Sequence, residues 1–167
     1  MIKEVTYSDY ATKAVEILSK GAFLNTTAAG KDNTMTIAWG SIGFMWGKPV
    51  LTIMVRKSRH SFELIEKNPE FTVSIPVNEM KAALGICGSK SGRDTDKFEA
   101  AGLEKLAGKK VSTPAIKGAG LHFECKVVYK QVMSTANLNQ TLADKWYADN
   151  DWHTLYYGEI VSAYVEE

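Results

Sequence analysis

Short apolar runs separated by turn residues dominate the first half of the chain. They are rich in threonine, β-branched and aromatic side chains, which favour strands, and they are too short for buried helices. Turns are indicated at Gly30-Lys31-Asp32-Asn33 and at Gly47-Lys48-Pro49, because glycine, asparagine and proline suit the backbone angles of turns. Strands are therefore predicted over residues 23–28, 34–39, 50–56 and 71–75.

Helical spacing occurs before, between and after these strands. A repeat that follows Ser8 or Asp9, the predicted cap, places Val15 and Leu18 on one face and ends at Gly21. Proline disfavours helical geometry in the residue before it, so an Asn-Pro pair is expected to close the second helix. Three shorter helices are predicted, from a cap at Ser58 to Asn68, over 80–84 and over 137–148.

The second half of the chain adds two long strands and a polar loop. Residues 121–132 alternate between apolar and polar side chains, which predicts a half-buried strand with His122 and Glu124 on its polar face. A final strand is predicted over 154–165, and the glycine- and serine-rich stretch 85–92 predicts a loop. This order of elements indicates a mainly β (α+β) fold, an antiparallel barrel with accessory helices.

Composition and charge narrow the possible partners. The chain has 167 residues, of which 45% are apolar, so one domain over residues 1–167 is expected. It carries 20 Lys and Arg against 19 Asp and Glu, and a net charge of +1 favours neither nucleic acid nor membranes as partners. The N-terminus lacks the apolar stretch of a signal peptide, so a cytoplasmic location is expected. Cys87 and Cys125 show no C-x-x-C pairing, which disfavours a disulfide framework or a zinc site.

The densest group of ligand-binding side chains is Arg56-Lys57-Ser58-Arg59-His60-Ser61, where an apolar strand gives way to a helix. Free N–H groups at a helix start, serine hydroxyls and guanidinium groups together meet the needs of a phosphate dianion. The alternative is a serine-capped helix with solvated basic side chains, and spacing alone does not separate the two. Neither G-x-x-x-x-G-K-[ST] nor G-x-G-x-x-G occurs, which argues against a nucleoside triphosphate site.

The segments around this group resemble a known family. The threonine-bearing strand Asn33–Ser41, the turn Gly47–Pro49 and the apolar strand into Arg56 resemble the flavin reductase-like, FMN-binding split-barrel family. Asp96-Lys97-Phe98 and His153 resemble that family's later landmarks. The resemblance spans most of the chain and implies an antiparallel split β-barrel with Greek-key character that holds flavin mononucleotide (FMN).

The resemblance also implies roles for single residues. Thr36 and its strand neighbours are expected to line the isoalloxazine ring, and Ser41 to lie near the ribityl chain or the phosphate. The phosphate itself is assigned to Arg56, Ser58, Arg59 and Ser61. The full set of expected cofactor contacts is Asn33, Met35, Thr36, Ala38, Trp39, Gly40, Ser41, Arg56, Ser58, Arg59, His60, Ser61 and Lys97.

Three further features each have two interpretations. The polar stretch 88–93 is either a flap that reaches the phosphate or the second substrate, or a solvated loop. His153 either orients the nicotinamide or flavin edge or has a structural role. Trp39, Trp46 and Trp152 either stack on a flavin or belong to the core or an interface. The histidines lack metal-ligand spacing, so no metal is predicted.

The resemblance implies an oxidoreductase that passes electrons from NADH or NADPH through FMN to free flavin or another acceptor. The flavin performs the hydride chemistry, so no catalytic acid–base pair is assigned. A homodimer with flavin sites near the subunit interface is also implied, with a small molecule or a protein as electron acceptor. Two alternatives stay open, namely an FMN-containing electron carrier without its own nicotinamide site and a non-redox β-barrel module that binds another ligand.

Overall fold

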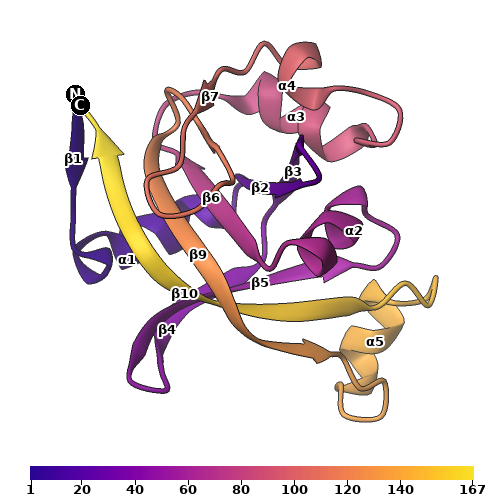
Figure 1. Cartoon of the computed structure of the whole chain (residues 1–167). Coiled ribbons are helices and arrows are strands. Elements are labelled where there is room, and N and C mark those ends of the chain that lie inside the picture. Colours follow the sequence, from indigo (N-terminus) through magenta and orange to yellow (C-terminus); the bar gives the residue numbers. More distant parts are fainter.

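One large antiparallel sheet forms the framework of the molecule, and a computed structural model describes all residues from Met1 to Glu167. Its strand order is β3-β2-β6-β9-β10-β5-β4, with β1 added alongside β10, and β3 is not paired with β4, so the sheet is not closed. Figure 1 shows β9 and β10 as long bent strands through the middle. The strands are β1 (Ile2–Glu4), β2 (Ala22–Ala28), β3 (Lys31–Ile37), β4 (Gly40–Met45), β5 (Lys48–Arg56), β6 (Glu70–Pro76), β9 (Gly120–Val132) and β10 (His153–Glu166).

Five helices and a small second sheet surround this framework. Helix α2 packs against β2, β3 and β5, and α3 packs against β2 and β3, so both lie near one edge of the sheet (Figure 1). The helices are α1 (Tyr7–Leu18), α2 (His60–Lys67), α3 (Lys81–Ser89), α4 (Lys97–Ala100) and α5 (Gln140–Trp146). Strands β7 (Lys105–Leu106) and β8 (Ala115–Ile116) form the small sheet. The predicted mainly β fold with accessory helices is confirmed. None of these helices is long and apolar enough to span a membrane.

Several predicted element boundaries are wrong. Helix α1 is capped at Thr6 rather than Ser8 or Asp9. Helix α2 begins after Arg59, because the Ser58 hydroxyl donates to Asp151 (2.5 Å) instead of capping the helix. Helix α3 continues to Ser89, so the predicted loop over 85–92 is helical in its first half. Apolar spacing identifies a helix more reliably than it identifies the helix ends.

Strand β4 was not predicted, and its hairpin explains why. Two glycines weaken the strand pattern in Gly40–Met45, and most of its side chains are exposed. Gly40 is nonetheless required, because a Cβ there would lie 2.8 Å from the Thr52 carbonyl oxygen. Trp46 and Gly47 both have positive φ, so the tight turn lies before Lys48, and the predicted turn at 47–49 belongs largely to β5.

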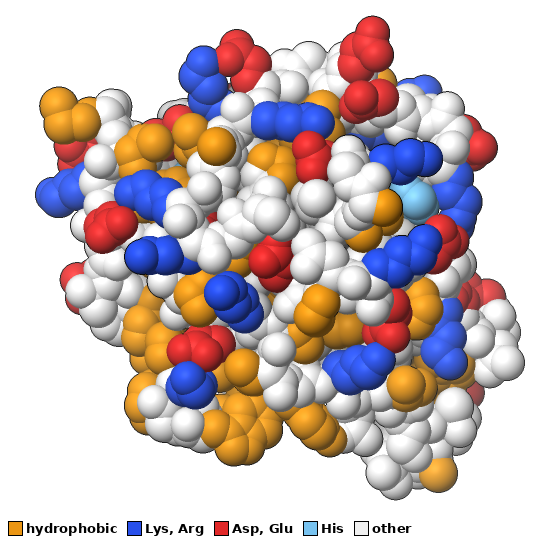
Figure 2. All heavy atoms as spheres, viewed as in Figure 1, with side chains coloured by type: hydrophobic (Ala, Val, Ile, Leu, Met, Phe, Trp, Pro, Cys, Tyr) orange, Lys and Arg blue, Asp and Glu red, His pale blue; other side chains and the backbone are white.

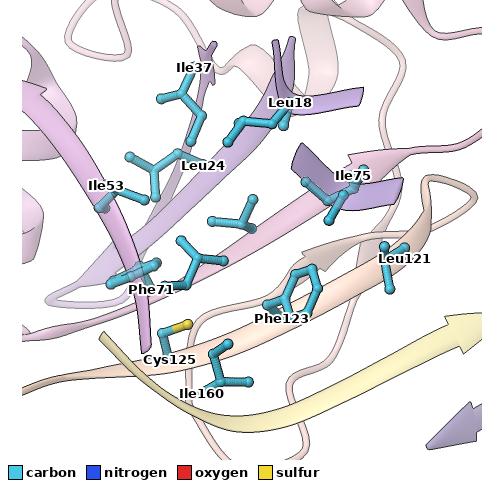
Figure 3. Packing of buried hydrophobic residues seen from close by; sticks show 14 of the residues in the cluster. Leu18, Leu24, Ile37, Ile53, Phe71, Ile75, Leu121, Phe123, Cys125 and Ile160 are labelled. Atoms are coloured by element: carbon cyan, nitrogen blue, oxygen red, sulfur yellow. The ribbon is translucent and has the colours of Figure 1, made fainter. Parts of the chain in front are cut away.

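The hydrophobic core lies in the concave side of the curved sheet. Figure 3 shows Leu24, Phe71 and Phe123 from three neighbouring strands pointing toward one another, with Leu18 of α1 near them. Each of these side chains is almost fully buried, and burying one such side chain contributes roughly 1.5–3 kcal/mol. The core therefore fixes the position of α1 relative to the strands of the sheet.

The polar face of β9 is buried over the first half of the strand, contrary to the alternation, whereas Lys126 on the same face is exposed as predicted. His122 and Glu124 are both 0% exposed, because the segment before β9 folds over them. The Glu124 carboxylate accepts from the backbone N–H groups of Lys109, Lys110 and Val111 (2.8, 2.7 and 3.3 Å). His122 lies between Ser74 and Glu166, with its ring nitrogens 3.0 and 2.8 Å from their side-chain oxygens, so it has a structural role.

Candidate functional site

Two connected hollows form a groove beside β3. The basic hollow, about 290 Å³, lies between β3, the start of α2 and the segment from Cys87 to Lys97. The aromatic hollow, about 220 Å³, lies where β3 meets the ends of β5 and α5. The two share Met35, Thr36 and Arg59, so they form one continuous groove. Figure 2 shows Lys and Arg side chains beside a histidine on the right of the molecule, near α2.

The first turn of α2 forms one wall of the basic hollow. The first N–H groups of any helix have no partner within the helix and point out of its N-terminus. Ser61 lies in this turn, is 1% exposed, and accepts a hydrogen bond from the Asn33 side-chain amide of β3 (3.0 Å). His60 lines the same hollow. Strand β3 and helix α2 thereby hold polar groups in fixed positions at this end of the groove.

Lys97 is the most unusual group in the basic hollow. Its side chain is buried, with 4% exposure, because Asp96 caps α4 and starts that helix against β3. Its ammonium donates to the Cys87 carbonyl oxygen (3.1 Å), and Lys97 takes part in none of the chain's ion pairs. Burial lowers the pKa of Lys97. A buried ammonium that lacks a counter-charge is costly, so this hollow is suited to an anion.

The aromatic hollow contains Trp39, Trp146 and His153. The two indoles meet edge to face with centroids 4.9 Å apart, and the Trp39 ring lies 5.5 Å from the His153 ring. The Tyr147 hydroxyl is 2.6 Å from His153 Nδ1. Burial, together with the charge of Arg56, lowers the pKa of His153 to about 4, so its ring is neutral at ordinary pH. This end of the groove offers flat apolar surfaces and one uncharged imidazole.

Arg56 lines the aromatic hollow, but its guanidinium is engaged within the chain. It donates to the carbonyl oxygens of Trp146 (2.8 Å) and Asp151 (2.6 Å), and it forms an ion pair with Asp149 (3.4 Å). The guanidinium also lies over the Tyr147 ring. Arg56 therefore fixes the segment that follows α5, whereas Arg59 forms no ion pair and lines both hollows.

The predicted contacts are only partly brought together. Gly40 and Ser41 line neither of the two hollows but a third, apolar one beside β4, which adjoins the aromatic hollow through the shared residues Ala38, Trp39 and Met54. The other members of the predicted set line the groove, namely Asn33, Met35, Thr36, Arg56, Ser58, Arg59, His60, Ser61 and Lys97. His153 also lines it.

Two of the three tryptophans considered for stacking lie outside the groove lining. Trp46 lies at the tip of the β4–β5 hairpin near Tyr129 and Tyr157. Trp152 stacks on Tyr147, with centroids 4.3 Å apart. Only Trp39 of these three lines the groove.

Several residues of the groove were not among the predicted contacts. Met54, Cys87 and Trp146 line it. Tyr147 is not part of the lining, but its hydroxyl contacts His153 and orients that ring. Trp146 and Tyr147 carried a weak signal, since two adjacent aromatics end a predicted helix. No group of three or more His, Cys, Asp or Glu side chains is arranged to hold a metal, and both cysteines are free and buried.

An open antiparallel sheet with an elongated groove, basic at one end and aromatic at the other, is the frame of a flavin-binding split barrel. The sequence profile of the flavin reductase like domain matches residues 16–167, so the chain belongs to the flavin reductase-like family. This membership confirms the resemblance inferred from the sequence motifs.

Three known proteins illustrate the similarity. An uncharacterized protein of Archaeoglobus fulgidus is 29% identical over 139 residues, which are 83% of this chain and 68% of that protein. The structure of flavoredoxin from Methanosarcina acetivorans superposes with a TM-score of 0.71 at 28% identity, over 88% of this chain and 68% of that one. An FMN-binding domain of a flavin reductases-like enzyme from Shewanella baltica gives 0.71 at 20% identity, over 99% and 77%. The split-barrel fold expected from the sequence is thus confirmed.

Proposed function

We propose that the groove binds FMN, with the phosphate in the basic hollow and the isoalloxazine ring toward the aromatic hollow. The observation that carries this proposal is the buried ammonium of Lys97, which has no counter-charge in the chain. A phosphate dianion provides that charge, and Trp39 at the other end provides an aromatic surface for a flat ring. The family membership of the chain supports the same ligand.

The residues of the groove divide into three groups in this proposal. Lys97, Arg59 and the first-turn N–H groups of α2 hold the phosphate, with Ser61 kept in position by Asn33. Met35 and Thr36 lie where the hollows join and contact the middle of the ligand. The Thr36 hydroxyl donates to the Leu84 carbonyl oxygen (2.6 Å), which fixes α3 against this strand.

The proposed reaction is electron transfer from NADH or NADPH through FMN to free flavin or another acceptor. Bound FMN supplies the hydride-accepting chemistry. Trp39 and Trp146 limit water at the aromatic end, and His153 offers an uncharged hydrogen-bonding ring there. The protein's contribution is therefore positioning and desolvation rather than acid–base catalysis.

A homodimer is part of the proposal. Trp39, Phe44 and Trp46 are 37%, 65% and 60% exposed, and they lie on or just before the β4–β5 hairpin beside the groove. Figure 2 shows apolar side chains along the lower left edge, where this hairpin projects in Figure 1. Clustered exposed aromatics are typical of interfaces, and a second subunit here would cover the open side of the aromatic hollow.

An electron carrier without its own nicotinamide site is the second candidate. The aromatic hollow is small, about 220 Å³, and Trp39 and Trp146 both line it. The similarity to a flavoredoxin favours the same candidate. In this case a partner protein would deliver and remove the electrons.

Anaerobic visible spectra of the purified protein with FMN, before and after NADH and then NADPH, separate these functions. Rapid bleaching of a protein-bound flavin spectrum is the result expected for a reductase. Bound flavin that stays oxidised with both nucleotides but is reduced by dithionite would instead identify the carrier. A protein that leaves the spectrum of added FMN unchanged would contradict both.

A further inference from the structure

One wall of the basic hollow is formed by a short segment, here named the closing loop, residues 90–93 between α3 and α4. We propose that the closing loop, held by the Arg93–Glu63 pair, selects flavins that end in a phosphomonoester and excludes flavin adenine dinucleotide (FAD). This inference rests on the proposed binding of FMN in the groove. It identifies Arg93 and Glu63 as specificity-determining residues that act through the position of the loop.

Arg93 ties the closing loop to the first turns of α2. Its Nε donates to Glu63 Oε1 (3.0 Å), its Nη2 contacts the same carboxylate, and its Nη1 donates to the Ser58 carbonyl oxygen (2.9 Å). All three nitrogens of the guanidinium therefore contact α2 or the segment that leads into it. Glu63 also lies 3.3 Å from His60 Nδ1, so the carboxylate joins the loop to a second residue of the hollow.

Gly92 shows how closely the closing loop fits against the walls of the hollow. A Cβ at this position would lie 2.0 Å from Asn33 Oδ1 and 2.9 Å from His60 Cδ2. The loop backbone therefore touches both β3 and α2, which are the two sides of the hollow. The loop is therefore packed closely against side chains from both walls of the hollow.

This closure determines which ligands fit. A phosphate next to Lys97 and Ser61 would lie in the hollow that the closing loop also lines. FMN ends at that phosphate, whereas FAD continues with a second phosphate and adenosine. FAD would fit only if the loop moved away from α2. Specificity would thus come from an obstacle to the larger ligand as well as from contacts to the smaller one.

The loop can be released without removing a positive charge from the hollow. Arg93 and Glu63 are 41% and 45% exposed, and exposed ion pairs contribute little to folding stability. Glu63→Ala therefore removes the contacts of Arg93 Nε and Nη2, leaves only the bond from Nη1 to the Ser58 carbonyl oxygen, and keeps every basic residue in place. Glu104→Ala is the matched control, because Glu104 also forms an exposed ion pair, with Lys117, away from the groove.

The experiment compares the affinities for FMN and FAD by quenching of flavin fluorescence in wild type, Glu63→Ala and Glu104→Ala. We expect wild type and Glu104→Ala to bind FMN at least about tenfold more tightly than FAD, and Glu63→Ala to lose most of that ratio by gaining affinity for FAD. Thermal unfolding of each variant checks that the fold is kept. A faster release of FMN from Glu63→Ala, measured by stopped flow, is also expected.

Two results would overturn the inference while leaving FMN binding intact. One is a wild-type protein that binds FMN and FAD equally well, and the other is a Glu63→Ala variant with an unchanged affinity ratio and unchanged release rate. Failure of the wild type to bind either flavin would instead contradict the proposed function, and the inference with it. The Gly92→Ala variant gives a second test, since its Cβ would push the loop away from Asn33 and should also admit FAD.

Discussion

Lys97 and Glu124 are both buried charged residues, but they differ in the hydrogen-bond partners that the chain provides for them. Glu124 accepts three backbone N–H groups from residues 109–111, so its charge is satisfied within the fold. Lys97 has one carbonyl partner and no carboxylate, and it lines a hollow. A buried charge that is satisfied by its own chain indicates structure, whereas one that is left short of partners indicates a ligand.

The largest effect is expected from Glu124→Ala. Removing this carboxylate leaves the N–H groups of residues 109–111 without their acceptor beside a buried strand, so the free energy of unfolding should fall by about 2–3 kcal/mol. Urea unfolding followed by tryptophan fluorescence measures the change. Glu104→Ala, which breaks only an exposed ion pair, should stay within about 0.5 kcal/mol of wild type. Equal effects in the two variants would remove the distinction drawn for Glu124.

Lys97→Met, unlike Glu124→Ala, is expected to weaken ligand binding without lowering the folding stability. It should weaken FMN binding by about 1.5–3 kcal/mol, the range for a lost charge-assisted contact, as measured by fluorescence quenching. The stability of the protein without ligand should not fall, because the variant removes a buried charge that lacks a counter-charge. Unfolding experiments that showed a loss of stability with unchanged FMN affinity would make Lys97 a structural residue.

The pH dependence of FMN affinity gives a second test of the role of Lys97. Burial lowers the pKa of Lys97 below its usual 10.5, and the ammonium is the form that attracts phosphate. The affinity for FMN should therefore be retained at pH values below that lowered pKa and fall as the pH rises through it. This loss should occur at a lower pH than the titration of a free lysine. Lys97→Met should abolish this alkaline loss. Titrations of FMN into both proteins over an alkaline pH series measure it.

His153 is a third buried titratable residue, and its ring is uncharged at neutral pH because burial lowers its pKa. Its pKa of about 4 in the folded chain lies below the value of about 6.5 for an unfolded chain, so unfolding takes up a proton between these two pH values. Stability from this residue is thus present above pH 6.5 and declines as the pH falls toward 4. Urea midpoints at pH 5 and pH 7 should differ less in His153→Phe than in wild type.

The smallest effect is expected from Tyr147→Phe. The change removes one hydrogen bond to His153 Nδ1 and leaves the stacking on Trp152, so it should cost about 1 kcal/mol of unfolding free energy. Nitrogen chemical shifts of the His153 ring should change in the variant, because the hydroxyl no longer fixes one ring nitrogen. Unchanged shifts would show that Tyr147 does not orient the ring.

Local patterns predicted six of the ten strands and the family but not the contacts between distant segments. The apolar run into Arg56 predicted β5, and the basic group after it predicted a ligand site at the start of α2. The engagement of Arg56 with Trp146 and Asp151 could not be predicted, because it joins residues about 90 positions apart. The alternation also placed Glu124 on an exposed face, because it does not show that residues 109–111, which lie 13 to 15 positions earlier, fold back over it.

The central claim is that the basic hollow recognises the phosphate of FMN. Riboflavin lacks only that phosphate, so a comparison of FMN and riboflavin binding to wild type and Lys97→Met isolates this contact. We expect wild type to bind FMN at least about tenfold more tightly than riboflavin, and Lys97→Met to lose most of this preference. Equal binding of FMN and riboflavin by the wild-type protein would contradict the account.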